Sequence, residues 1–171
     1  MKDFIILNGT MGAGKSTVCA ELKELLPKCG FIEGDACWTW RADLGEAAKE
    51  MVLRNIAFLA DAYLACPDYE SVLLCWVIPE EKIFAEILGR MQQRCWVHRF
   101  TLLLEKEALM ARLERDIAQG RRQRDVVRRS LERYPVFARM NTQKIEVSDI
   151  SPRVAAEEIL SAVHAKNKEN G

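Results

Sequence analysis

The sequence has no apolar run that approaches the roughly 18 residues of a membrane-spanning helix, so no membrane segment is expected. Only four consecutive apolar residues precede Asn8, which is too short for the apolar region of a secretory signal peptide. The six cysteines form no CxxC pair and lie scattered through apolar stretches. This spacing argues against a zinc site or a disulfide framework and predicts reduced thiols in a cytoplasmic protein.

Net charge is also lacking, because 25 Lys and Arg residues balance 25 Asp and Glu residues. The molecule therefore has no overall electrostatic attraction to nucleic acid or to an anionic membrane, and neither is an expected partner. The chain shows no internal repeat and no linker, and its 171 residues suffice for one buried core. We predict a single domain over residues 1–171, with a polar tail at 166–171 that frays.

Apolar strand patterns alternate with helical patterns along the chain. Continuous apolar runs predict strands at 4–7, 31–32, 71–78, 97–104 and 144–147. Apolar residues at helical spacing predict helices from 15 to about 27, over 44–65, from 79 to about 91, over 106–118, up to about 140, and over 154–163. Such alternation implies crossovers between parallel strands. The expected fold is a three-layer α/β/α domain with a central, mostly parallel five-stranded sheet.

Residues 9–16 read Gly-Thr-Met-Gly-Ala-Gly-Lys-Ser and match the phosphate-binding pattern GxxxxGK[ST] between an apolar strand and a helix. Glycines let backbone N–H groups close on phosphate oxygens, and the helix N-terminus adds partial positive charge. We expect Lys15 to contact the β- and γ-phosphates and the Ser16 hydroxyl to ligate Mg²⁺. The residues predicted to hold the nucleotide phosphates are Gly9, Met11, Gly12, Ala13, Gly14, Lys15, Ser16 and Thr17.

Asp35 follows the second predicted strand, at the carboxyl edge where open α/β sheets bind ligands. A carboxylate there could accept the proton of an attacking hydroxyl or hold a magnesium-bound water. The alternative is a turn-forming aspartate that caps the next segment. We predict that Asp35 is a catalytic residue, and the choice between base and metal partner stays open.

Trp38, Trp40 and Arg41 come within six residues of Asp35. Two indoles and a guanidinium beside a catalytic carboxylate suggest an acceptor pocket, although core packing with a solvated arginine fits the sequence equally well. Asn55 interrupts the apolar stripe of the long helix, so its amide is expected to bond either nearby backbone or the substrate. The predicted acceptor-binding residues are Asp35, Trp38, Arg41 and Asn55.

Nine arginines and no lysine lie in residues 112–139, against four acidic residues. Guanidinium groups favour planar, bidentate contacts with phosphate. A glycine interrupts the helix just before Arg121, Arg122 and Arg124, so we expect these three on a mobile lid at about 119–127 over the transferring phosphate. The alternative is a salt-bridged surface helix.

The chain resembles the nucleoside monophosphate kinase-like branch of P-loop proteins, particularly the shikimate kinase and gluconate kinase group and the related AAA_33-type small kinases. The motifs are the P-loop, the Gly34-Asp35 pair, Arg-Leu-Glu-Arg at 112–115, the arginines at 121–124 and Ser-Asp-Ile-Ser-Pro at 148–152. The resemblance spans nearly the whole length. It implies ATP as the phosphate donor, with adenine between Arg112 and Pro152, Asp35 at the acceptor, and the arginines at 121–124 on phosphate.

Three departures from that group leave the acceptor open. Shikimate kinases have a glycine triplet after the third strand, where residues 75–79 here read Cys-Trp-Val-Ile-Pro. Gluconate kinases follow Gly-Asp with His-Pro, where residues 36–38 here read Ala-Cys-Trp. The third strand also lacks an acidic Walker B residue, so Mg²⁺ is expected on Ser16, the nucleotide and waters, with Asp35 as an alternative partner.

The leading hypothesis is an ATP-dependent phosphotransferase that moves the γ-phosphate of MgATP to a hydroxyl or phosphate of a small molecule. Lys15, Asp35 and the three lid arginines would be its catalytic residues. One alternative is a nucleoside, nucleotide or antibiotic kinase in which an indole stacks on the acceptor. An alternative from another class is an ATP-binding regulatory ATPase module. Monomer and homodimer both remain open.

Overall fold

The structure, a computed structural model, describes residues 1–39 and 44–170. Within them, five strands form one parallel sheet in the order β2-β3-β1-β4-β5. The strands are β1 (Asp3–Asn8), β2 (Cys29–Glu33), β3 (Ser71–Cys75), β4 (Trp96–Leu103) and β5 (Gln143–Glu146). Because all pairs are parallel, the carboxyl ends of the strands share one edge. The predicted α/β fold is confirmed.

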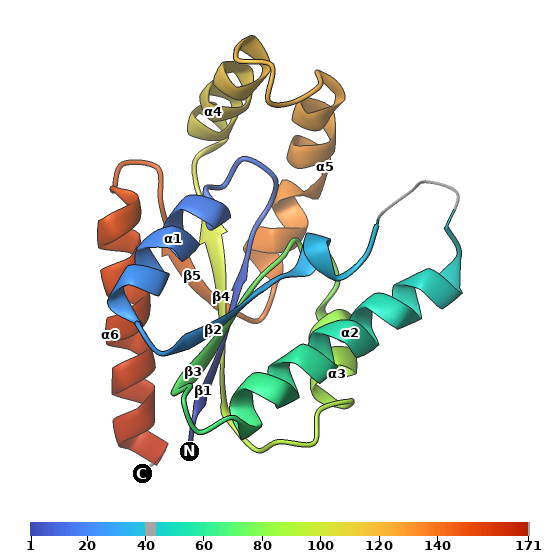
Figure 1. The fold of residues 1–171 in the computed structure, drawn as a ribbon. Helices are drawn as coiled ribbons and strands as arrows, with labels where there is room; N and C mark the ends of the chain where they lie inside the picture. The colour runs from blue at the N-terminus through green and yellow to red at the C-terminus, as the bar shows by residue number, and fades with distance from the viewer. Residues whose placement is uncertain (40–43, 171) are drawn as a thin grey trace.

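Helices cover both faces of the sheet (Figure 1). On one face lie α1 (Lys15–Leu25) and α6 (Pro152–Asn170), and on the other lie α2 (Glu46–Ala65) and α3 (Glu81–Leu88). A short 3-10 turn, η1 (Gly34–Cys37), follows β2. The carboxyl edge is topped by α4 (Lys106–Ala118) and by the beginning of α5 (Asp125–Arg139), at the top of Figure 1.

The core has two halves, one on each face of the sheet. Ile5 and Leu7 of β1 belong to the half that includes α1 and α6, whereas Phe4 and Ile6 belong to the half that includes α2 and α3. All four side chains are at most 1% exposed. Burial of both faces explains why β1 is a continuous apolar run rather than an alternating pattern.

The third strand is shorter than predicted, because β3 ends at Cys75 and not at Ile78. The buried Asn8 side chain accounts for the difference. Its Nδ2 donates to the Ile78 carbonyl at 3.0 Å, and its Oδ1 accepts from the Ile78 N–H at 2.8 Å. The backbone of Ile78 is thus bonded to a side chain instead of a neighbouring strand. This clamp holds the segment after β3 beside the end of β1, where the P-loop begins.

The closing helix is longer than predicted, since α6 continues to Asn170. Asn167 Nδ2 donates to both carboxylate oxygens of Asp3, at 3.0 and 3.2 Å. Lys166 Nζ donates to the Val97 carbonyl at 3.1 Å. These contacts join the end of α6 to β1 and β4, so residues 166–170 continue the helix instead of forming the frayed tail that we expected.

In the part of the chain that the structure describes, no helix combines the length and the hydropathy needed to cross a bilayer.

The six cysteines are free thiols, and Cys19 and Cys75 are buried. A hydrogen bond with Cys75, followed by burial, raises the pKa of the Cys19 thiol, so this group stays protonated.

Candidate functional site

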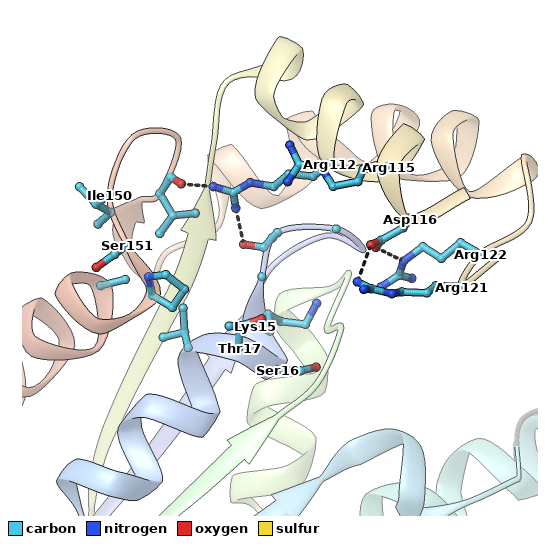
Figure 2. A pocket seen from close by; sticks show the side chains of 17 residues that line it. Lys15, Ser16, Thr17, Arg112, Arg115, Asp116, Arg121, Arg122, Ile150 and Ser151 are labelled. Atoms are coloured by element: carbon cyan, nitrogen blue, oxygen red, sulfur yellow. Dashed lines mark hydrogen bonds and ion pairs between the residues drawn. The ribbon is translucent and has the colours of Figure 1, made fainter. Parts of the chain in front are cut away.

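A cavity of about 570 Å³ opens at the carboxyl edge of the sheet (Figure 2). Its walls come from the P-loop with the first turn of α1, from α4 and the residues after it, and from the segment between β5 and α6. The lining residues are Gly12, Ala13, Gly14, Lys15, Ser16, Thr17, Val18, Arg112, Arg115, Asp116, Arg121, Arg122, Val147, Ile150, Ser151, Pro152 and Ala155. Small-molecule sites typically measure about 300–1,000 Å³, so a nucleotide can be accommodated.

The side chain of Lys15 turns back onto the P-loop from the first residue of α1. Its Nζ donates to the carbonyls of Gly9 at 2.9 Å and Thr10 at 3.0 Å. Burial lowers the pKa of Lys15, and the nearby Asp35 carboxylate acts in the opposite direction. The amine is thus bonded to two carbonyl oxygens, which phosphate oxygens of a ligand can replace.

This lowered pKa leads to a prediction about pH. Bound phosphates would favour the charged amine, so Lys15 should have a higher pKa in the complex than in the free protein. As the pH rises through the pKa of Lys15 in the free protein, nucleotide affinity should fall. In that pH range, binding should be accompanied by the uptake of up to about one proton per nucleotide. Calorimetric titrations in two buffers of different ionisation enthalpy measure this uptake. Proton release on binding in that pH range would contradict the prediction.

The P-loop is tied to α5 by two reciprocal contacts. The buried Ser130 Oγ donates to the Met11 carbonyl at 3.2 Å, and Thr10 Oγ1 donates to the Ser130 carbonyl at 3.4 Å. Gly9 and Met11 were both predicted to hold phosphate. Both lie in this loop, but neither is among the residues that line the cavity. We did not single out Ser130 from the sequence, since a serine in an arginine-rich helix carries no pattern that points to the P-loop.

Arg112 connects the three walls of the cavity. From α4, its Nη1 donates to the Ala13 carbonyl, and its Nη2 donates to the carbonyls of Val147 and Ser148. The contacts to the P-loop and to the segment after β5 are dashed in Figure 2. Pro152 lines the same cavity. Both residues that the resemblance assigned to adenine therefore belong to this cavity.

Changing Arg112 to methionine should weaken nucleotide binding about tenfold, because the hydrogen bonds of a charged group are worth about 1.5–3 kcal/mol. The Tm should also fall by about 5 °C, since three carbonyls lose their donor. Calorimetry with ATP and thermal unfolding measure the two effects. A matched control is Arg128→Met, which removes only an exposed ion pair with Glu132 at 3.1 Å. Wild-type affinity and Tm in Arg112→Met would refute the bridging role.

Two of the three predicted lid arginines line the cavity, and Asp116 holds both of them (Figure 2). Arg121 Nη1 lies 3.4 Å from Asp116 Oδ1, and Arg122 Nε lies 3.0 Å from Asp116 Oδ2. Arg124 instead stands at the N-cap of α5, outside the lining. Asp116 is a site residue that the sequence interpretation missed. The available signal was its spacing of five and six residues from the two arginines.

Asp35 lies in η1, on the other side of the P-loop from Pro152. The sheet order places β2 and β5 at opposite edges, with β1 and the P-loop between them. Asp35 is outside the cavity lining, and its Oδ1 accepts a hydrogen bond from Trp76 Nε1 at 3.0 Å. Burial lowers the pKa of Lys15, and the negative charge of Asp35 offsets part of this effect. The structure therefore brings this carboxylate near the P-loop but not to the nucleotide side of it.

Glu33, at the end of β2, is a second carboxylate that the sequence interpretation did not single out. Burial raises the pKa of Glu33, and the negative charge of Asp35 adds to this effect, while Lys15 lowers it. A glutamate that ends a strand two residues before Asp35 was the available signal. The two carboxylates together make this side of the P-loop acidic.

The structure places two other predicted acceptor-binding residues, Trp38 and Asn55, in contacts with the protein itself. Trp38 packs against the core half that contains α2 and α3, and its buried Nε1 has no hydrogen-bond partner among the described residues. This favours the core-packing alternative. Asn55 Nδ2 donates to the Cys37 carbonyl at 2.9 Å, so the amide donor is used by nearby backbone and not by a substrate. Trp40 and Arg41 lie outside the described residues.

The parallel sheet, the P-loop and the cavity above it define the P-loop kinase-like fold. Residues 5–134 match the AAA_18 family, described as an AAA domain. This match covers more than half of the chain, and the chain belongs to that family. No curated protein matches it in sequence.

Solved structures share the fold over almost their whole length. The tunicamycin resistance protein of Deinococcus radiodurans is 20% identical, with a TM-score of 0.71, over 95% of this chain and 96% of that chain. A gluconokinase from Sinorhizobium meliloti 1021 is 18% identical, with a TM-score of 0.67, over 98% and 94%. A shikimate kinase from Acinetobacter baumannii, in complex with shikimate, is 20% identical, with a TM-score of 0.65, over 97% and 95%. The resemblance in fold to shikimate and gluconate kinases, which we drew from the motifs, is confirmed.

Proposed function

We propose that the protein is a small-molecule kinase that transfers the γ-phosphate of ATP to a hydroxyl or phosphate group of its acceptor. The observation that carries the proposal is the placement of charge around the P-loop. Lys15, Arg121 and Arg122 lie on the cavity side, and Asp35 lies on the opposite side, toward β2. The fold shared with a gluconokinase and a shikimate kinase supports it.

The nucleotide would lie in the cavity with its base between Arg112 and Pro152 and its phosphates in the P-loop. Phosphoryl transfer needs positioning and neutralisation of charge more than covalent chemistry. Lys15 would exchange its two carbonyl partners for phosphate oxygens. Arg121 and Arg122, held by Asp116 in the free protein, would turn to the transferring phosphate as a lid. Arg124 stands outside the cavity, and we leave it out of this proposal.

Mg²⁺ fits the oxygen donors beside the P-loop. Ser16 lines the cavity at the first turn of α1, and the carboxylates of Glu33 and Asp35 lie at the end of β2 and in η1. Among the described residues, no group of three or more His, Cys, Asp or Glu side chains could hold a metal ion. This suits Mg²⁺, which usually takes one or two protein ligands and keeps phosphates and waters. We propose Ser16 as the protein ligand, and the bound ion would neutralise phosphate charge.

The acceptor would approach from the side of β2 and β3. Asp35 would take the proton of the attacking hydroxyl as general base. The described groups on that side include the carboxylates of Glu33 and Asp35 and the indole of Trp76, which donates to Asp35. This acidic and aromatic surrounding suits a neutral or cationic acceptor better than an acid of shikimate type.

The test is an assay of ADP release with MgATP and a panel of sugars, hydroxy acids, nucleosides and antibiotics, with mass spectrometry of the acceptor. Asp35→Asn should lower acceptor-stimulated turnover by about 10²–10⁴-fold. The Kd for ATP should stay unchanged, because Asp35 lies outside the cavity. The matched control is Asp68→Asn, in the exposed turn between α2 and β3.

One result would count against the kinase proposal, and another would count only against Asp35 as the general base. The first is slow hydrolysis that depends on Lys15 and that no acceptor in the panel stimulates, which would favour a regulatory ATPase. The other is full turnover by Asp35→Asn with a phosphorylated acceptor as product, which would remove the general base while leaving phosphate transfer intact.

A further inference from the structure

Trp76 occupies the place directly beside the proposed base. It follows β3, the strand between β2 and β1, and its backbone N–H donates to the Leu7 carbonyl at 3.3 Å. Two residues further on, the Asn8 side chain holds the backbone of Ile78 from both its N–H and its carbonyl. The backbone that carries the Trp76 side chain is therefore anchored on both sides to the end of β1.

The indole itself is also fixed. Trp76 is 8% exposed and packs in the core half that contains α2 and α3. Its ring lies so close to Gly34 that a Cβ atom on Gly34 would be 2.2 Å from Trp76 Cγ and 2.4 Å from Trp76 Cδ1. Only a glycine leaves room for the ring at this position. The close packing aims the indole N–H at the next residue, Asp35, with Nε1 3.0 Å from Oδ1.

In the described part of the chain, Asp35 has no comparable support of its own. It is an exposed residue in the four-residue turn η1. An exposed carboxylate in a short turn samples several rotamers, and fixing the side chain in one of them costs conformational entropy. Within residues 1–39 and 44–170, the indole of Trp76 is the only hydrogen-bond donor to the Asp35 side chain, and Oδ2 has no hydrogen-bond partner. Among the described residues, Oδ1 is thus held by a hydrogen bond and Oδ2 accepts none.

We infer that Trp76 is a positioning residue for this site: its indole N–H holds Oδ1 of Asp35 and thereby presents Oδ2 to the hydroxyl of the acceptor. This inference rests on the proposed function of Asp35 as general base. In the transfer, the acceptor O–H proton passes to Oδ2 as the acceptor oxygen bonds to the γ-phosphorus and the bond from that phosphorus to the bridging oxygen of ADP breaks. The hydrogen bond that an indole N–H donates to an ionised carboxylate is stronger than one to a neutral acceptor, and this strength suits the positioning role of Trp76.

The first test is a double-mutant cycle on kcat. Trp76→Phe keeps an aromatic ring over Gly34 but removes the N–H, and it should lower kcat about ten- to a hundredfold with the KM for ATP unchanged. In an Asp35→Asn background, the same change should have almost no further effect, because Trp76 acts through Asp35. The matched control is Trp96→Phe at the start of β4, which should leave kcat at the wild-type value.

The second test needs no activity. In ¹⁵N-labelled protein, the Trp76 indole proton should exchange slowly with solvent, and Asp35→Ala should speed that exchange about tenfold or more by removing the acceptor. The indole proton of Trp96 serves as the internal reference and should not change. This measurement keeps Trp76 itself intact, so a folding defect of the Trp76 variant cannot obscure it.

The outcomes separate the inference from the proposed function. If Trp76→Phe lowers kcat equally in the wild-type and Asp35→Asn backgrounds, Trp76 has only a packing role and the inference is overturned. Unchanged indole exchange in Asp35→Ala would overturn it as well. If the exchange test succeeds but no acceptor is ever phosphorylated, the contact stands and the kinase proposal fails.

Discussion

Lys15→Met should lower kcat by about 10³-fold, the loss expected when a preorganised donor to transition-state charge is removed. The side chain already lies over the P-loop, with Nζ 2.9 Å from the Gly9 carbonyl and 3.0 Å from the Thr10 carbonyl. Lys15 is the single lysine among the described residues that line the cavity. No neighbouring lysine can therefore replace its charge on the phosphates.

The same variant should not lose stability. Burial disfavours the charged form of Lys15, as its lowered pKa shows, so a neutral side chain of similar length should keep the Tm or raise it. Steady-state kinetics and thermal unfolding measure both effects. Lys23→Met is the matched control, since Lys23 is on the exposed side of the same helix, 4.6 Å from the Phe31 ring centroid. An inactive variant with a strongly lowered Tm would point to a structural role instead.

Gly12→Ala should disrupt the nucleotide site through a clash between the P-loop and α4. Gly12 has a φ of +84°, which strains any residue with a Cβ by about 1–2 kcal/mol. The added Cβ would also lie 2.6 Å from Leu113 Cδ2 and 2.9 Å from Leu113 Cγ, and Leu113 is fully buried. To relieve this contact, the Leu113 side chain or the P-loop must move, and Leu113 directly follows Arg112 in α4. We expect the Tm to fall by about 5–10 °C and the affinity for ATP to fall more than tenfold.

Two other glycines separate the two causes. Gly120→Ala introduces the same kind of strain, with a φ of +69°, but into open space. Gly45→Ala introduces neither, because its φ is −88° and nothing lies within 4 Å. Thermal unfolding should rank the losses as Gly12 above Gly120 above Gly45. Equal losses for Gly12→Ala and Gly120→Ala would mean that contact with Leu113 does not matter.

The elements and the P-loop could be predicted because their signals are local. A strand buried on both faces is a continuous apolar run, and β1 and β3 read that way. The spacing of the glycines, Lys15 and Ser16 specifies one loop between a strand and a helix, and the structure has that loop. The arginines predicted for the lid were placed by a helix break, which also depends only on neighbours in sequence.

Other features depend on residues that lie far apart in sequence. The end of β3 is set by Asn8, which is 70 positions from the residue that it holds. Asp35 meets Trp76 across 41 positions, and Arg112 meets Val147 across 35. No periodicity reports such pairs. For this reason the length of β3, the support of Asp35 and the closure of the cavity by Arg112 were not predicted.

The sequence by itself determined the alternation of strands and helices, the phosphate-binding loop and the class of fold, since each follows from the chemistry of adjacent residues. Only the tertiary structure decided that Arg112, Arg121 and Arg122 face one cavity and that Arg124 does not. It also decided that the amide of Asn55 serves the backbone and that the indole of Trp76 serves Asp35. The physical reason is that the direction of a side chain depends on which distant groups the folded chain brings within hydrogen-bond distance.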